Sequence, residues 1–388
     1  MSRRYHIVMN YHFDAISRRG ELSEHNIDLW KRDFALLRQS GFTGIVSNVV
    51  LWSTGRSGIA PYDPIEVQQR FLDVCQEAGL TVMLAPPLMH IPSIMAKLPD
   101  EKRYAGVDMY GRALPVANVF NARYRKEFLG PFLREIIHRF GHHPAVESYC
   151  FGDHFVGSAS GFSPDDRRNF ILFLRRKYRT VSALNRAHQS RHRSFDDVRM
   201  PRFQSPWTPL WRDFTSARRQ WLIDYVMDLD RFVRRYDRNR AHRIPFGIMS
   251  WDLLQDKNDF GGISAEYLNA LDVIATSLNF PAALYPRSLA FTLTDWFFGT
   301  IRRLCPHKEI GVGDIPGVRN QAWQGAGVFP SAKEIIALLE RTLRYDANWF
   351  IIDGHRKSLQ QTAVAYHQVY AFHKRNLREL GAFFKSLG

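Results

Sequence analysis

The chain alternates short apolar runs with longer amphipathic ones. The apolar runs lack a strict polar and apolar alternation, which is typical of strands buried on both faces. Eight of them predict strands at 5–10, 44–50, 80–84, 146–151, 245–250, 273–279, 309–314 and 348–353. Segments between and after them repeat apolar residues with the helical period. These segments predict helices at 23–39, 63–79, 122–140, 164–178, 213–236, 265–271, 288–304, 331–345 and 359–387.

Local signals agree with several of these helix ends. Ser23 suits an N-cap, and Gly41 stands just beyond the exit of the same helix. Asp63 followed by Pro64 is a favourable pair for the N-cap and the first helical position. The order of elements therefore rests on capping residues as well as on hydrophobic period.

Eight strand-helix units in succession predict an α/β protein with the (β/α)8 TIM barrel fold. A doubly wound open sheet is the structural alternative. We expect a single barrel domain over residues 1–388, since no linker, low-complexity tract or internal repeat divides the chain. Residues from about 180 to 212 form the longest irregular stretch and predict a loop inserted after the fourth strand.

Composition narrows the class of protein. Hydrophobic residues make up 45% of the 388 residues and charged residues 23%, which is typical of a globular protein with a large core. Three cysteines without a CxxC spacing argue against a disulfide scaffold and a thiolate zinc site. The N-terminus does not read as a signal peptide and no run is long enough to span a membrane, so we expect a cytoplasmic protein.

The net charge of +15 could attract an anionic partner. Many arginines fall in helical segments, however, and solvated helix faces explain them better than an anionic substrate does. Nucleic acid is not expected as a partner, because the chain has no zinc finger, helix-turn-helix or RNA-binding aromatic motif.

Candidate chemistry lies at the carboxyl ends of the strands, where barrel enzymes carry their active sites. Asp153, His154 and Asp314 are the candidate catalytic residues. The candidate substrate-binding residues are His12, Asn48, Trp52, His90, Trp251, Asp252, Asn279, Tyr285, Trp323 and Asp353. Carboxylates, amides and aromatic rings together suit a carbohydrate. No HExxH motif or glycine-rich phosphate loop is present, so we expect neither a metal nor another cofactor.

Each of these residue types also has a structural interpretation. Asp153 and Asp314 could equally form turns or caps, a turn is the favoured interpretation of Asp353, and Trp52 could be a core residue. The pair at 142–143 precedes the fourth strand, at the opposite end of the barrel, and is interpreted as structural.

Several segments resemble glycoside hydrolase family 42. They are residues 34–44, 77–82, 139–146, 170–187 and 209–214. The resemblance implies a β-galactosidase-like barrel that retains anomeric configuration, with an Asn-Glu pair after strand four and a second Glu after strand seven. Here the usual glutamates are not retained. The Asn-Glu positions fall on Asp153 and His154, and the second Glu falls near Gly313 or Asp314.

These residues predict a glycoside hydrolase or transglycosidase acting on an oligo- or polysaccharide, with Asp153 and Asp314 as acid/base and nucleophile or base. Carboxylates about 5 Å apart retain configuration, and a gap of about 6.5–9.5 Å inverts it. His154 is an alternative acid. The alternatives for the whole chain are a non-catalytic carbohydrate-binding protein and an enzyme acting on an anionic polysaccharide.

Overall fold

A computed structural model gives the fold of the chain. It describes residues 4–11, 24–47, 64–86, 104–150, 161–201, 208–239, 245–249, 268–269, 272–277, 287–315, 331–353 and 377–387.

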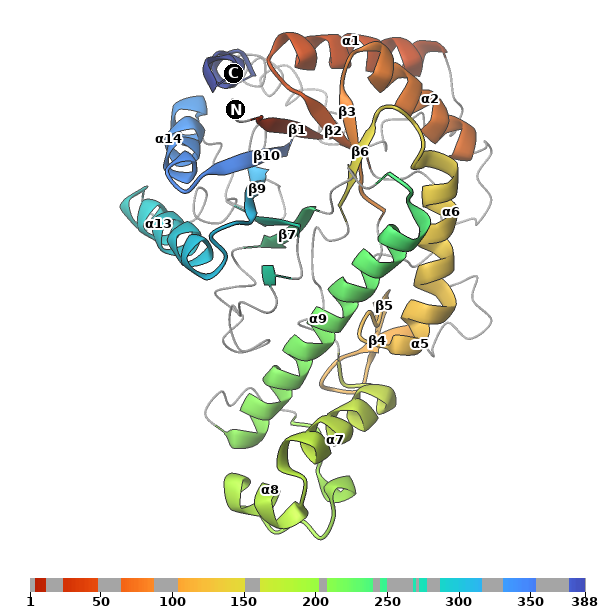
Figure 1. Cartoon of the computed structure of the whole chain (residues 1–388), viewed down its shortest axis with the longest axis vertical. Coiled ribbons are helices and arrows are strands. Elements are labelled where there is room, and N and C mark those ends of the chain that lie inside the picture. The colour runs from red at the N-terminus through yellow and green to blue at the C-terminus, as the bar shows by residue number, and fades with distance from the viewer. Residues whose placement is uncertain are drawn as a thin grey trace.

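Eight parallel strands form the central sheet (Figure 1). They are β1 (His6–Tyr11), β2 (Gly44–Ser47), β3 (Thr81–Leu84), β6 (Val146–Tyr149), β7 (Pro245–Met249), β8 (Val273–Ser277), β9 (Glu309–Ile315) and β10 (Ala347–Asp353). Their spatial order is β6-β3-β2-β1-β10-β9-β8-β7. Apart from β6 and β7, which stand at the two ends of this order, each strand pairs with the next strand of the strand-helix series, and β1 pairs with β10, which joins the first unit to the last. This is the strand order of a (β/α)8 barrel, so the predicted fold is confirmed.

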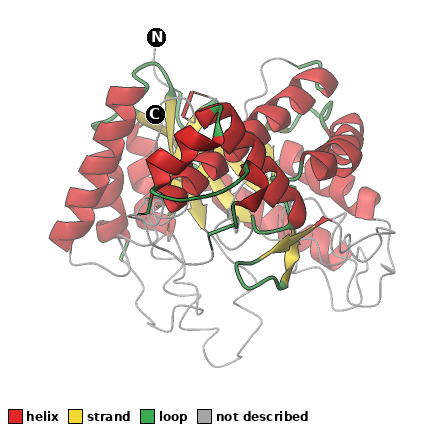
Figure 2. Ribbon diagram, turned by 90° about the horizontal axis from the view of Figure 1, so that it is seen from below, coloured by secondary structure: helices red, strands yellow, loops and turns green. Residues whose placement is uncertain are grey.

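The helices, red in Figure 2, lie around the strands and, in part, beyond them. They are α1 (Glu24–Gln39), α2 (Pro64–Glu77), α5 (Ala122–Tyr124), a π-helical turn (Arg125–Leu129), α6 (Gly130–Phe140), α7 (Pro164–Tyr178), α8 (Val181–His188), α9 (Pro209–Tyr236), α13 (Arg287–Leu304) and α14 (Ala332–Leu343). Residues 377–387 are also helical. No helix among the described residues is long and apolar enough to cross a membrane.

Two hydrophobic clusters divide the barrel into an inside and an outside. The larger cluster fills the layer between strands and helices, with Phe34 of α1 and Phe71 of α2 at right angles in edge-to-face contact. The smaller cluster fills the barrel itself with side chains from five strands. Its members are Val8, Val46, Met83, Val273, Trp349 and Ile351. The barrel is therefore a packed core rather than a channel.

An extension beyond the barrel is built from two segments, one between β3 and β6 and the other between β6 and α9. It contains the antiparallel hairpin of β4 (Ala105–Val107) and β5 (Ala113–Ala117), then α7 and α8. In Figure 1 this extension lies below the barrel, with α9 running from it back to the strands. We call residues 161–201, which include α7 and α8, the arm. The hairpin was not predicted from the sequence.

The prediction of a wholly irregular loop at 180–212 was wrong in part. Thr180 caps α8 by accepting a hydrogen bond from the backbone amide of Ala183, and Thr208 caps α9 through the amide of Trp211. These caps make two stretches of this region helical. The arm is therefore a structured unit with its own helices.

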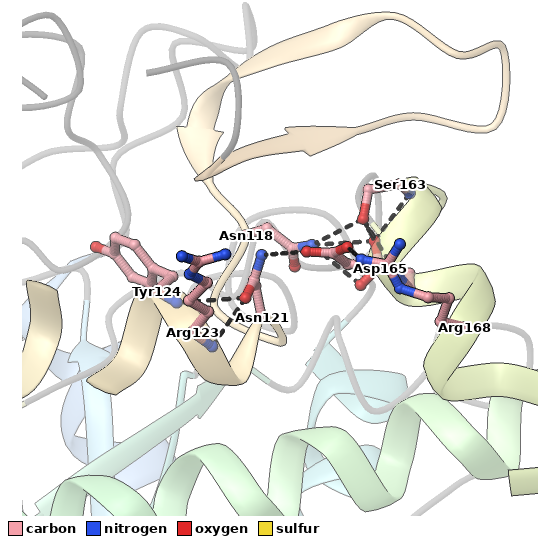
Figure 3. Close-up of polar contacts among 8 residues, drawn as sticks. Asn118, Asn121, Arg123, Tyr124, Ser163, Asp165 and Arg168 are labelled. Carbon is pink, nitrogen blue, oxygen red and sulfur yellow. Dashed lines mark hydrogen bonds and ion pairs between the residues drawn. The ribbon is translucent and has the colours of Figure 1, made fainter. Parts of the chain in front are cut away.

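A polar junction fastens the arm to the rest of the extension (Figure 3). Asn118 Nδ2 donates to both carboxylate oxygens of Asp166 at 3.0 Å, and Asn121 Nδ2 donates to Asp165 Oδ2 at 3.1 Å. Ser163 completes a capping box with Asp166 at the start of α7. Burial raises the pKa of Asp166 above its usual range, although its hydrogen bonds with Ser163 and Asn118 act in the opposite direction.

The interpretation of the 142–143 pair as structural is supported for His143. Its Nδ1 accepts a hydrogen bond from the amide of Ala145, and its Nε2 lies 3.1 Å from Asp73 Oδ1. His143 thus fixes the turn before β6 and joins it to α2.

Candidate functional site

The parallel register brings the carboxyl ends of the strands to one rim of the barrel. Ser47 at the end of β2 pairs with Leu84 at the end of β3, and Leu84 pairs with Tyr149 at the end of β6. Across the sheet, Asn10 near the end of β1 pairs with Asp353, the last residue of β10. The segments that directly follow these strands in the sequence therefore begin at this rim.

Most of the candidate residues lie outside the described residues. They are His12, Asn48, Trp52, His90, Asp153, His154, Trp251, Asp252, Asn279, Tyr285 and Trp323. For Asp314 and Asp353 the structure describes the backbone, in β9 and β10. Both stand at the carboxyl ends of their strands, as predicted. Their parts in binding or catalysis stay predictions.

The strand that carries Asp314 is irregular at that point. Val312 of β9 pairs with Phe350 of β10, but Ile352 pairs with Ile315, so β9 has one extra residue between the two pairs. Such a bulge changes the alternation of faces along a strand, and bulges are frequent beside active sites. The extra residue lies at 313–314, next to the rim.

Asn10 is a polar residue of the rim that the sequence did not indicate. Val8 and His6, two and four residues earlier, contact interior residues, so the alternation of β1 places Asn10 on the interior face. Asn10 is 7% exposed, and its Oδ1 has no hydrogen-bond partner among the described residues. Its position inside an apolar strand hid it, but a strict count of alternate residues could have found it.

Tyr11, by contrast, faces outward. Its hydroxyl donates to Asp33 Oδ2 of α1 at 2.8 Å, and its ring packs against Phe34 and Phe71. Although Tyr11 is at the strand end, it belongs to the layer between sheet and helices.

A second polar interior residue comes from β6. Ser148 pairs with Met83 of β3 in the register, and Met83 belongs to the interior cluster. Ser148 is buried, and its Oγ has no hydrogen-bond partner among the described residues. Asn10 and Ser148 therefore add hydrogen-bonding atoms without a partner among the described residues to the interior of the barrel.

The amino ends of the strands hold a different set of polar residues. The His6 ring stacks on Trp349 with centroids 3.8 Å apart, and Trp349 Nε1 donates to Glu309 Oε2 at 2.7 Å. Glu147 accepts a hydrogen bond from Thr81 Oγ1 at 2.8 Å. We call these five residues, with Arg4, the lower network.

Glu147 is held as a carboxylate in the lower network. Burial raises the pKa of Glu147, but His6, Thr81 and Arg4 together outweigh burial and leave the pKa below its usual value. Arg4 Nη2 lies 2.8 Å from Glu147 Oε1. An ionised, paired carboxylate at this end of the barrel is suited to stability rather than to proton transfer.

No group of three or more potential metal ligands occurs among the described residues. The expectation of no metal stays a prediction for the rim residues that are not described.

A family model matches residues 22–255, more than half of the chain, and its description is beta-galactosidase of the glycoside hydrolase 42 type. The chain belongs to this family. The match begins just before α1, ends shortly after β7 and includes the whole arm. No curated protein matches the chain significantly.

Solved structures agree on the fold. A beta-galactosidase from the psychrophilic Marinomonas ef1 superposes with a TM-score of 0.77 at 16% identity, covering 98% of this chain and 59% of that one. A cold-adapted beta-galactosidase from Rahnella sp. R3 superposes with a TM-score of 0.75 at 17% identity, covering 100% of this chain and 56% of that one. The catalytic domain of a beta-amylase from Paenibacillus polymyxa superposes with a TM-score of 0.67 at 12% identity, covering 91% of this chain and 93% of that one. The chain thus spans less than two thirds of these beta-galactosidases but most of the amylase domain.

Proposed function

We propose that this protein hydrolyses or transfers glycosidic bonds of an oligo- or polysaccharide at the carboxyl-end rim, with Asp153 and Asp314 as the reacting carboxylates. The observation that carries the proposal is the position of Asp314, at the bulged carboxyl end of β9 in a barrel of the glycoside hydrolase 42 family. Active sites of such barrels lie at this end.

The bulge supports a role for position 314 through the alternation of faces. Ile310 and Val312 of β9 belong to the outer cluster. A regular strand would place position 314 on that same face, toward the helices. The extra residue resets the alternation there, which favours the interior face for position 314.

The chemistry requires two carboxyl groups in different protonation states. One must be protonated to give a proton to the leaving oxygen, and the other must be ionised to attack the anomeric carbon or activate water. Asp153 follows β6 and Asp314 ends β9, two strands from different parts of the barrel wall. His154 is the alternative acid, because the intrinsic pKa of an imidazole is close to neutral.

Asn10 and Ser148 support a polyol substrate. A buried acceptor without a partner costs roughly 1–3 kcal/mol. A sugar hydroxyl can donate to Asn10 Oδ1 and remove that cost. The substrate contacts that we propose from the sequence are His12, Asn48, Trp52, His90, Trp251, Asp252, Asn279, Tyr285, Trp323 and Asp353.

The test is an activity screen on a panel of aryl glycosides, followed by Asp153→Asn and Asp314→Asn. Each variant should lower kcat/KM by about 100-fold or more, the usual contribution of a general acid or base, with an unchanged Tm. Asp224→Asn is the matched control, because Asp224 lies on the exposed side of α9 and contacts only Gln220 among the described partners. Full activity in either aspartate variant removes that residue from the mechanism.

A non-catalytic carbohydrate-binding protein is the second candidate. The observation favouring it is that Asp153 and His154 stand where the family resemblance expects Asn and Glu. This candidate predicts sugar binding without cleavage of any glycoside in the panel.

A further inference from the structure

The arm concentrates positive charge. Residues 161–201 contain ten arginines and lysines against four aspartates, a net charge of +6 out of +15 for the whole chain. The aspartates are engaged within the extension. Asp165 pairs with Arg168, Asp196 pairs with Arg175, and Asp197 accepts backbone hydrogen bonds before the turn at 195–197. Asp166 is buried in the junction. The positive charge of the arm is therefore not balanced locally.

Five arginines of the arm face solvent without a side-chain partner in the described part of the chain. They are Arg176, Arg179, Arg186, Arg191 and Arg199. An arginine presents its N–H groups as a planar fork that matches a carboxylate, sulfate or phosphate in a bidentate manner. The five exposed side chains come from α7 and its C-cap, from α8 and from the segment that follows, and we call these five arginines the basic surface of the arm.

The backbone that carries this surface is well fixed. Asp213 of α9 pairs with Lys177 at the end of α7, and its Oδ2 lies 2.9 Å from His188 Nε2 at the end of α8. Asn185 of α8 donates from Nδ2 to the carbonyl of His192 at 2.9 Å. These contacts join α7, α8 and the following segment to α9, so that a bound anion meets a preorganised surface.

The arm lies on the same side of the barrel as the rim. At its carboxyl end, α9 is tied to the amino end of β8, because Arg234 Nη2 lies 2.6 Å from Asp272 Oδ2. A helix of 28 residues is about 42 Å long, whereas the five residues of β8 span about 17 Å. The amino end of α9 therefore extends past the carboxyl ends of the strands, and α7 and α8 pack there (Figure 1).

We propose that the basic surface of the arm binds an anionic polysaccharide, one that carries carboxylate groups along its chain. This inference rests on the proposed function, because the polymer that is cleaved at the rim is the one that contacts the neighbouring arm. It names the substrate class as acidic rather than neutral. Charge complementarity and the position of the arm beyond the rim both favour an extended polymer over a small glycoside.

Nucleic acid is a poorer fit to the same surface. Binding of single strands uses exposed aromatic rings as stacking platforms. Within residues 161–201 the one strongly exposed large hydrophobic side chain is Leu172. Tyr178 and Phe195, which lie close to these arginines in sequence, are both partly buried, and Phe195 lies under the guanidinium of Arg175 at 6.0 Å.

The experiment measures binding of three carboxylated polymers, polygalacturonate, alginate and hyaluronate, to the full chain. The arm variant replaces Arg176, Arg179, Arg186, Arg191 and Arg199 with Gln. A control variant removes the same charge from exposed positions of the barrel helices, as Arg134→Gln, Lys333→Gln, Arg344→Gln, Arg378→Gln and Lys385→Gln. Fully methyl-esterified pectin is the neutral counterpart of polygalacturonate, and a DNA duplex is the nucleic-acid probe.

We expect at least one acidic polymer to bind the wild type and to bind the arm variant about tenfold more weakly at low salt, with the control variant within about twofold. The difference should vanish at 1 M salt, where charges are screened within about 3 Å. Binding to none of the three polymers, equal loss in both variants, equal binding of the methyl ester, or tighter binding of DNA would each overturn the inference.

Failure of the proposed function gives a different result. In an Asp314→Asn background, replacement of the five arm arginines should weaken binding of the acidic polymer by the same factor, because Asp314→Asn leaves those arginines unchanged. If no glycoside or polymer is cleaved, the proposed catalysis fails while the binding result stands. If cleavage occurs but the arm variant binds normally, the inference about the arm fails and the catalysis stands.

Discussion

Trp349→Phe tests the division of the barrel into a structural lower end and a functional rim. Trp349 is 1% exposed, stacks on His6 and donates to Glu309. Phenylalanine keeps an aromatic ring but removes the indole N–H and part of the packing volume. Loss of a hydrogen bond to a charged acceptor costs roughly 1.5–3 kcal/mol, and the remaining void adds about 1 kcal/mol. We expect a total of about 2–4 kcal/mol.

The expected change in Tm follows from the size of the chain. Unfolding entropy of roughly 2.1 cal/mol/K per residue gives about 0.8 kcal/mol/K for 388 residues. The variant should therefore melt about 3–5 °C lower. Thermal unfolding followed by circular dichroism measures this shift, and the kcat/KM of the folded variant should equal that of the wild type at 25 °C.

The control for this variant is Trp296→Phe. Trp296 is on α13 and is 49% exposed, so its Tm should change by less than about 1 °C. Equal melting of both variants would refute the assignment of Trp349 to the stability of the barrel. Loss of activity in Trp349→Phe without loss of stability would refute the separation of the lower network from the active site.

Three further predictions concern the carboxylate of Glu147, a pair of glycines and the interior residue Asn10. Because the folded pKa of Glu147 lies below its unfolded value of about 4.5, its stabilisation is present above pH 4.5 and is lost as the pH falls through the folded value. Glu147→Gln should therefore flatten the acid limb of a Tm-against-pH curve, and an unchanged limb would contradict this. A Cβ at Gly44 would lie 2.9 Å from the carbonyl oxygen of Thr81, so Gly44→Ala should cost about 1–3 kcal/mol in denaturant unfolding. Gly299 lies in α13, and a Cβ there would meet the ring of Tyr345 at 3.4 Å. Gly299→Ala should therefore be neutral or should stabilise the fold by up to about 1 kcal/mol. The reverse ranking of the two glycine variants would refute the packing argument. Asn10→Ala should lower kcat/KM about tenfold with little change in Tm, and unchanged kinetics would remove Asn10 from the substrate contacts.

The barrel was predictable because its strands are short, apolar and buried on both faces. The predicted helix at 164–178 matches α7 (Pro164–Tyr178), where a capping box and a proline mark the start. The β4–β5 hairpin escaped prediction, since its strands are only three and five residues long and its register is irregular. The short helix α8 was missed for a similar reason, being eight residues long.

The rim was predictable as a place, but its composition was only partly so. Parallel strands must end together, which put Asp314 and Asp353 at one edge. Whether a residue within a strand faces inward depends on register and bulges that the sequence does not state. Asn10 and Ser148 were missed on that account. The carboxylates Glu147 and Glu309 were also missed, because their partners come from strands distant in sequence.

The most direct test of the proposed chemistry is a crystal structure of the chain with a bound glycoside chosen from the activity screen. The account predicts the sugar at the carboxyl-end rim, with the carboxylates of Asp153 and Asp314 on opposite sides of the anomeric carbon. Their separation should be about 5 Å, or about 6.5–9.5 Å if a water molecule takes part. A sugar bound away from the rim, or carboxylates that do not both face it, would contradict the account.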